Sequence, residues 1–140
     1  MAFQNPSPVE RKKILEEAKT VAVVGLSDNP ERTSYMVSQA MQRSGYRIIP
    51  VNPMVTEVLG EKAVRSLAEL TEPVDIINVF RRSEQIMPVA EEAAKYGKAK
   101  VFWMQQGIYN EEAAQYCKDH GMTVVMDTCI KVDHALLIRK

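Results

Sequence analysis

Cysteine is scarce in this sequence, and the two cysteines present, Cys117 and Cys129, are not in a C-x-x-C spacing. Two cysteines are too few for the disulfide framework of a small secreted protein. We therefore expect the chain to work in a reducing compartment, the cytoplasm. An excess of either charge is also missing, because 18 basic side chains balance 18 acidic ones. This balance gives no general attraction to nucleic acid or to anionic lipid, so we expect neither as a partner.

Long apolar segments are absent as well. The longest apolar runs, such as residues 21–24, have the length of a strand, whereas a membrane span takes about 20 residues. Residues 1–10 are polar, contain two prolines and lack the apolar core of a signal peptide. No Ser/Gly linker, charge block or solenoid repeat divides the chain. These absences predict a single domain over residues 1–140 that does not bind a membrane.

The sequence contains enough apolar side chains for one core, 46% of its 140 residues, and these occur in alternating helical and strand patterns. The predicted helices cover residues 8–19, 33–44, 66–70, 84–96, 111–120 and 132–138, and the predicted strands cover residues 20–24, 46–51, 74–80, 101–104 and 123–126. This alternation implies parallel strands joined by right-handed crossovers. We therefore predict an α/β fold, a Rossmann-like three-layer sandwich with a five-stranded parallel sheet.

The loop after the first predicted strand is suited to binding an anion. It runs from Gly25 to Arg32 and leads into a helix, whose free amides and dipole favour negative charge. Arg32 and the hydroxyls of Ser27 and Ser34 can add donors to a phosphate. The loop keeps one glycine of the G-x-G-x-x-G pattern, since Ser27 and Pro30 stand at the other two places. Alternatively, these residues only cap and solubilise the helix.

The second predicted strand argues against NAD. Dinucleotide-binding sheets carry an acidic residue at the end of this strand to hold a ribose, but here the strand is followed by Asn52 and Pro53. The G-x-x-x-x-G-K-[ST] phosphate loop is also absent. A phosphate-bearing ligand other than NAD is therefore favoured.

Polar and aromatic residues follow two further strands at the same edge of the predicted sheet. Phe80 and Arg81 follow the third strand, and Gln106 follows the fourth. They are able to flank a purine and its phosphates, although Phe80 could equally belong to the core and Arg81 face solvent. The remaining candidates, which are Asp75, Asp127, His120 and the pair Cys129 and His134, are assigned structural roles, and no metal-ligand cluster is visible.

Several motifs in order resemble a known family. They are Gly25-Leu-Ser27 with Pro30-x-Arg32-x-Ser34, Gly45-Tyr-Arg-Ile-Ile-Pro-Val-Asn-Pro53, Val74-Asp75 through Phe80-Arg81, Trp103-Met-Gln-x-Gly107 and Asp127-Thr-Cys129. Over about residues 18–137 the chain resembles the small single-domain CoA-binding proteins, which are similar to the N-terminal CoA-binding domain of the succinyl-CoA synthetase alpha subunit. Thr128 is a departure, because the family commonly has arginine there.

The resemblance implies coenzyme A as the ligand and assigns residues to it. By this resemblance the residues that meet the phosphates are Gly25, Ser27, Arg32 and Ser34, those that border the nucleotide are Asn52 and Pro53, and those at the adenosine end are Phe80 and Arg81. CoA carries a 3′-phosphate on its ribose, which suits a neutral strand end. Ligase activity is not expected, since the chain is too short to include the later domain of the synthetase.

Two functions remain open at this point. The chain is either a non-catalytic module that binds CoA or an acyl-CoA for sensing, for carriage or for a protein partner, or it is a small enzyme or enzyme subunit acting on a CoA thioester or CoA disulfide. Cys129 is the first candidate for thiol chemistry; in a binding protein we expect it to be buried and inert. No evident set of nucleophile, base and oxyanion donors is present, so we predict no catalytic residues and favour the binding protein. The sequence leaves a homodimer possible.

Overall fold

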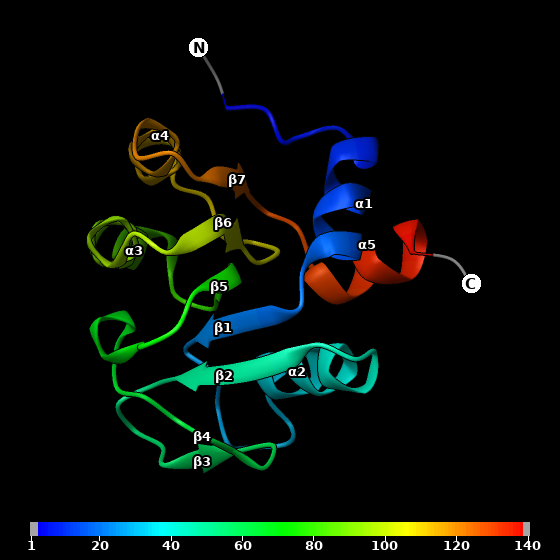
Figure 1. Ribbon diagram of the computed structural model, residues 1–140, viewed down its shortest axis with the longest axis vertical. Coiled ribbons are helices and arrows are strands. Elements are labelled where there is room, and N and C mark those ends of the chain that lie inside the picture. The colour runs from blue at the N-terminus through cyan, green and yellow to red at the C-terminus, as the bar shows by residue number, and fades with distance from the viewer. Residues whose placement is uncertain (1–2, 139–140) are drawn as a thin grey trace.

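A computed structural model describes residues 3–138, in which helices and strands alternate (Figure 1). The helices are α1 (Pro8–Glu17), α2 (Thr33–Arg43), α3 (Ile86–Tyr96), α4 (Glu111–Asp119) and α5 (Ile130–Leu137), with 3₁₀ turns at Leu67–Glu69 and Ser83–Gln85. The strands are β1 (Thr20–Val24), β2 (Arg47–Val51), β3 (Glu57–Val58), β4 (Glu61–Lys62), β5 (Val74–Val79), β6 (Ala99–Met104) and β7 (Thr123–Val125). The predicted single domain over 1–140 extends past these described residues at both ends.

The main sheet has five parallel strands in the order β2-β1-β5-β6-β7, so the predicted α/β Rossmann-like fold is confirmed. β1 lies between β2 and β5, and the chain reverses direction across the sheet at β1. In a doubly wound sheet, ligands bind beside the carboxyl ends of the strands at such a reversal. The pair β1 and β5 therefore marks the expected position of a site.

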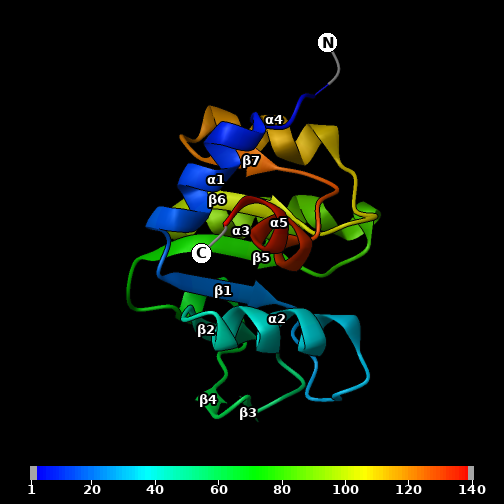
Figure 2. The ribbon, with the colours of Figure 1, turned by 90° about the vertical axis from the view of Figure 1, so that its right-hand side faces the viewer.

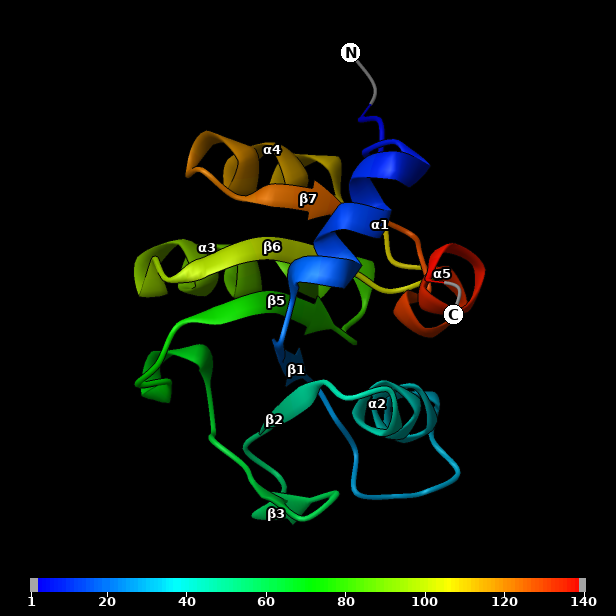
Figure 3. The same cartoon turned by 45° about the vertical axis from the view of Figure 1, so that its right-hand side comes forward.

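Helices cover both faces of the sheet, and the strand sequences explain why. Successive side chains of a strand point to opposite faces, so a doubly covered strand is apolar at every position. In β1, Val21 and Val23 pack towards α1, α2 and α5, whereas Ala22 and Val24 pack towards α3 and α4. Figures 2 and 3 show these two helical layers with the sheet between them.

The predicted boundaries differ from the structure in a few places. The short antiparallel hairpin of β3 and β4 was not predicted, because strands of two residues leave no periodic pattern. The third long helix begins at Ile86 instead of residue 84, after a 3₁₀ turn, which places Pro88 in its first turn. The last helix begins at Ile130, two residues before its predicted start.

Capping side chains fix the starts of α1 and α4 but not the start of α2. The Ser7 hydroxyl accepts from the Glu10 amide at 3.2 Å at the start of α1, and the Asn110 side chain caps α4 in the same way. α2 differs, since its N-cap residue Arg32 makes no side-chain cap bond. Among residues 3–138, no helix is long and apolar enough to cross a membrane.

Candidate functional site

The carboxyl ends of β1, β2 and β5 are tied together by backbone hydrogen bonds. The Gly25 amide donates to the Val51 carbonyl at 2.9 Å, and the Phe80 amide donates to the Val24 carbonyl at 2.9 Å. The segments that leave these three strands are thus held side by side at the point where strand order reverses. This is the edge at which the sequence placed the site.

Gly25 is required at this junction by its backbone and by its neighbour. Its φ is +85°, and a Cβ placed on it would lie 2.4 Å from the carbonyl oxygen of Phe80. Any other residue would push apart the loops after β1 and β5. Gly25 therefore allows the loops after β1 and β5 to pack closely, whether or not a ligand also approaches its backbone.

A depression of about 630 Å³ lies at this junction. Its walls are formed by Gly25, Ser27, Glu31, Arg32, Thr33, Ser34, Asn52 and Phe80. Of the nine predicted site residues, the six brought together here are Gly25, Ser27, Arg32, Ser34, Asn52 and Phe80. The other three, Pro53, Arg81 and Gln106, follow β2, β5 and β6 at the same edge but do not line the depression. Their contact with a ligand stays a prediction.

The N-terminus of α2 opens into this depression, because Arg32, Thr33 and Ser34 form part of its wall. The first amides of a helix have no acceptor inside the helix, and they carry the positive end of its dipole. An anion placed here would receive backbone hydrogen bonds without requiring any further cation.

The hydroxyls of the loop organise its backbone. The Ser34 Oγ accepts from the Ser27 amide at 3.0 Å, and the Ser27 Oγ accepts from the Asn29 amide at 3.0 Å. The Asn29 Oδ1 accepts in turn from the Glu31 amide at 3.0 Å. Because each serine oxygen acts here as an acceptor, the O–H of Ser27 is left as a donor towards the depression.

Asn52 connects two loops, a role that the sequence did not reveal. Its Nδ2 donates to the Leu26 carbonyl at 3.0 Å, and its Oδ1 accepts from the Met54 amide at 2.9 Å. The side chain therefore fixes the loop after β1 against the loop after β2. It gives this side of the depression a neutral wall, whereas an acidic residue would repel a phosphate.

The charges around the depression are few. Among residues 3–138, neither Arg32 nor Arg81 forms an ion pair, so both guanidinium groups remain available. Glu31 also lines the depression and was not predicted, because a carboxylate is not expected beside a phosphate. Arg32 and Glu31 offset each other formally, so the amides and dipole of α2 are the remaining attraction for an anion.

Several other candidates have the structural roles that were predicted for them. The carboxylate of Asp75 accepts from the amides of Lys19 and Thr20 at 2.8 and 3.0 Å. The His120 ring lies against Tyr116 and bonds its carbonyl through Nδ1 at 2.8 Å. No group of three metal-ligating side chains occurs within the part of the chain that the structure describes.

The two cysteines differ in environment. Cys117 is fully buried, and this burial raises its pKa to about 12. Cys129 is only partly buried at the start of α5, which corrects the expectation of a buried thiol. His134 packs edge-on against Tyr46, with ring centroids 5.6 Å apart, and Tyr46 precedes β2 at the amino edge of the sheet. The imidazole thus lies towards the opposite edge from Cys129, which disfavours a thiol and base pair.

A larger depression, about 1090 Å³, lies elsewhere, between the segment before α1, α4 and β7. Its lining includes three glutamates, Glu10, Glu111 and Glu112, against one lysine, Lys118. This charge disfavours an anionic ligand, so size alone does not identify the site.

The order of the strands and the depression beside β1 and β5 define a doubly wound α/β protein with a candidate ligand site at its topological reversal. A family model described as CoA binding domain matches residues 19–135, and the chain belongs to this family. The protein YneT of Bacillus subtilis is 62% identical over 134 residues, covering 96% of this chain and 98% of YneT. The resemblance inferred from the motifs is confirmed.

The chain is also similar to a solved structure and to part of a longer enzyme subunit. A Thermus thermophilus protein of known structure is 37% identical, covers 95% of this chain and 100% of its own, and superimposes with a TM-score of 0.90. The alpha subunit of an ADP-forming acetate–CoA ligase II from Pyrococcus furiosus is 23% identical over 122 residues, which is 80% of this chain but 27% of the subunit. The chain thus corresponds to about a quarter of that subunit's length.

Proposed function

We propose that this protein binds coenzyme A or an acyl-CoA at the carboxyl edge of its sheet and acts as a non-catalytic binding, sensing or carrier module. One observation carries the proposal: the predicted phosphate residues line a single depression at the N-terminus of α2, where strand order reverses. Membership of the CoA binding domain family supports the choice of ligand.

The site suggests how CoA would lie. Its phosphates would accept from the first amides of α2, from Arg32 and from the Ser27 hydroxyl. The adenosine would lie between Asn52 and Phe80, with Pro53 and Arg81 at its margins. The pantetheine arm would then run along the sheet edge past Gln106, towards the end of β7. The neutral end of β2 suits the 3′-phosphate of CoA.

The proposal also covers the location, the domain organisation and the partners of the protein. We place the protein in the cytoplasm as a single domain with CoA or an acyl-CoA as its small-molecule ligand. A protein partner or a second copy of the chain would use the bound ligand, whereas nucleic acid and membrane would not be partners, given the balanced charge.

Isothermal titration tests this proposal directly. CoA is expected to bind, and NAD is expected to bind more weakly because no acidic residue follows β2 to hold its ribose. Native mass spectrometry of the purified protein would identify any retained CoA species by its mass. An affinity for NAD equal to or above that for CoA would contradict the proposal.

A second candidate function is an enzyme or enzyme subunit that acts on a CoA thioester or CoA disulfide. It is favoured by the position of Cys129, a partly buried residue, at the same sheet edge. Iodoacetamide separates the two functions. For a binding module, Cys129 reacts no faster than an ordinary thiol, and Cys129→Ser retains CoA affinity. A fast reaction, or rapid formation of a mixed disulfide with CoA at this position, would favour the enzyme.

A further inference from the structure

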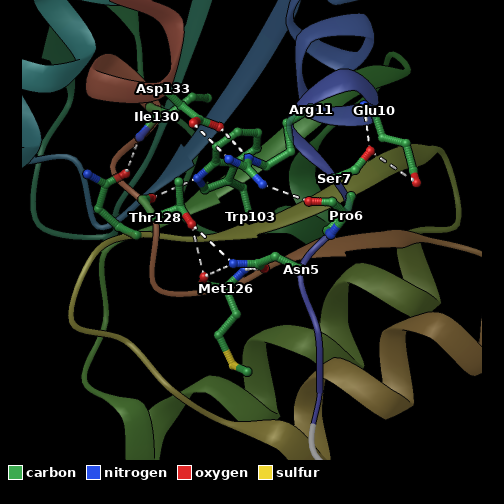
Figure 4. Close-up of polar contacts among 11 residues, drawn as sticks. Asn5, Pro6, Ser7, Glu10, Arg11, Trp103, Met126, Thr128, Ile130 and Asp133 are labelled. Carbon is green, nitrogen blue, oxygen red and sulfur yellow. Dashed lines mark hydrogen bonds and ion pairs between the residues drawn. The ribbon is translucent and has the colours of Figure 1, made fainter. Parts of the chain in front are cut away.

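The loop after β7, residues 126–129, is held by a side chain from the far end of the sequence. The Asn5 Nδ2 donates to the Met126 carbonyl at 2.8 Å, and the Asn5 Oδ1 accepts from the Met126 amide at 2.7 Å (Figure 4). This paired contact replaces the hydrogen bonds that a neighbouring strand would make at the edge of the sheet. Asn5 thereby fixes the first residue of the loop.

Strand β6 fixes the middle of the same loop. The Thr128 amide donates to the Met104 carbonyl at 3.3 Å, and the Trp103 Nε1 donates to the Thr128 carbonyl at 2.8 Å. The Thr128 hydroxyl donates to the Met126 carbonyl at 3.0 Å and lies 3.4 Å from the Asn5 Nδ2. The contacts of Asn5 and those of Trp103 therefore meet at Thr128, as Figure 4 shows.

Asp127, between these anchored residues, has an unusual backbone conformation. Its φ is +54°, in the left-handed region that residues other than glycine, asparagine and aspartate rarely adopt. Its carboxylate accepts from the Gly107 amide at 2.7 Å and from the Tyr109 hydroxyl. The backbone and the side chain of Asp127 are therefore both held in place, the side chain by two residues that follow β6.

A second contact holds the segment before α1 against α5. Arg11 donates from Nε to Asp133 at 2.9 Å and from a terminal nitrogen to the Pro6 carbonyl at 2.7 Å. The Arg11 and Asp133 side chains are 18% and 7% exposed, so the ion pair is largely shielded from water. The segment that carries Asn5 and the helix that follows the loop are thus fixed to one another.

The loop lies at the same edge of the sheet as the candidate site. All five strands are parallel, and β7 is three strands away from β1. At a spacing of about 4.8 Å per strand, the loop is roughly 14 Å along the edge from the end of β1. In the pose proposed above, the pantetheine arm of a CoA molecule whose phosphates lie at α2 extends in this direction.

We propose that Asn5 is a positioning residue, which acts through the loop 126–129 on the thiol end of the bound CoA. This inference rests on the proposed function. Asn5 does not touch the phosphate site, so its removal should loosen the loop and weaken contacts to the pantetheine arm alone. If Asn5 only covers the sheet edge, its removal would affect stability but not the way CoA is held.

The experiment compares CoA with adenosine 3′,5′-bisphosphate, which lacks the pantetheine arm. Isothermal titration of Asn5→Ala is expected to show CoA affinity reduced by about 2- to 30-fold, the usual range for residues that act through a neighbour, with the bisphosphate affinity unchanged. The alkylation rate of Cys129 by iodoacetamide, measured without ligand, is expected to increase because the loop opens more often. Asn5→Asp, which keeps the acceptor and loses the donor, should show the same selective loss and provides a second variant.

Ser7→Ala is the matched control. Ser7 lies two residues from Asn5 and caps α1 without contacting the loop, so this variant lowers stability while leaving both affinities and the alkylation rate unchanged. The positioning role would be overturned if Asn5→Ala lost affinity equally for both ligands, if it lost affinity for neither, or if Ser7→Ala showed the same losses of affinity. If the wild-type protein binds neither ligand, the proposed function is contradicted. In that case the alkylation rate still tests Asn5, because an unchanged rate in Asn5→Ala would reject its positioning role without any binding data.

Discussion

At the scale of single residues, the site depends on side chains that build the loop as much as on those that face a ligand. Ser34, Ser27 and Asn52 each bond a backbone group of the loop after β1. Arg32 and Phe80, by contrast, line the depression with no such bond from their side chains among residues 3–138. Substitutions of these two groups should therefore have different consequences, one for the shape of the loop and the other for affinity.

Replacement of Arg32 tests the direct contribution to affinity. Arg32→Ala is expected to weaken CoA binding by about 1.5–3 kcal/mol, the scale of a hydrogen bond to a charged group, which is roughly 10- to 150-fold in the dissociation constant. The free energy of unfolding in urea should be nearly unchanged, because the Arg32 side chain is exposed and makes no cap bond. Arg43→Ala, at the opposite end of α2, is the control and should leave affinity unchanged. Equal affinity of Arg32→Ala and the wild type would show that Arg32 is only a surface charge.

Gly25 provides a test of the packing between the loops after β1 and β5. Gly60 has a similar φ of +77° but nothing within 4 Å of the position that a Cβ would occupy, so Gly60→Ala carries the backbone cost alone, about 1–2 kcal/mol. Gly25→Ala adds a clash with the Phe80 carbonyl and should cost about 1–3 kcal/mol more. The free energies of unfolding in urea give this difference. If the two variants lose the same stability, the close approach at Gly25 is not a constraint.

At the scale of elements, the start of β1 is joined to β5 through one carboxylate. Asp75 accepts from the amides of Lys19 and Thr20 and lies 3.6 Å from the Lys100 ammonium. Burial acts to raise the pKa of Asp75, but the two amides and Lys100 outweigh it and lower the pKa below its usual range. The carboxylate therefore connects the turn after α1 to the strand beside the site.

This shift predicts how stability depends on pH. The folded pKa lies below the unfolded value of about 3.9, so ionised Asp75 stabilises the fold above that pH, and its contribution is lost as pH falls through the folded pKa. Asp75→Asn should cost about 1 kcal/mol at pH 7, the scale of a solvent-accessible hydrogen bond. The difference in the free energy of unfolding between Asp75→Asn and the wild type should shrink below about pH 4.

Urea unfolding at several pH values measures the effect, with Asp119→Asn, a change at an exposed carboxylate of α4, as the control. A difference between Asp75→Asn and wild type that stays constant from pH 7 to pH 3 would be inconsistent with this account.

The elements were largely predictable from sequence because their signals are local. Buried parallel strands are continuous apolar runs, so the five strands of the main sheet were predicted in the right places. Capping residues such as Ser7 mark helix starts, so the start of α1 was predicted as well. The β3 and β4 hairpin was missed because four strand residues carry no period. The contact between Asn52 and Leu26 and the position of Glu31 in the depression were also missed, since both depend on how two loops meet.

At the scale of the whole molecule, topology determines which residues share an edge. The strand order places the ends of β1, β2 and β5 together, which is why six predicted residues from three segments line one depression. Sequence motifs predicted this set, but they did not predict that Asn5 reaches Met126. That contact joins parts of the chain with no pattern in common, and only the assembled fold brings them together.

The contact between Asn5 and Met126 has a consequence for the order in which the protein is made. The two residues are 121 positions apart, so at about 5–20 residues per second a ribosome adds Met126 roughly 6–24 s after Asn5. During translation the segment that contains Asn5 lacks its partner until all the described strands have been synthesised, because β7 ends at Val125. The loop after β7 acquires its native contacts only after β7 has been synthesised, and a chain stalled before Met126 would contain residues 25–32 without the contact that holds the loop at the other end of this edge.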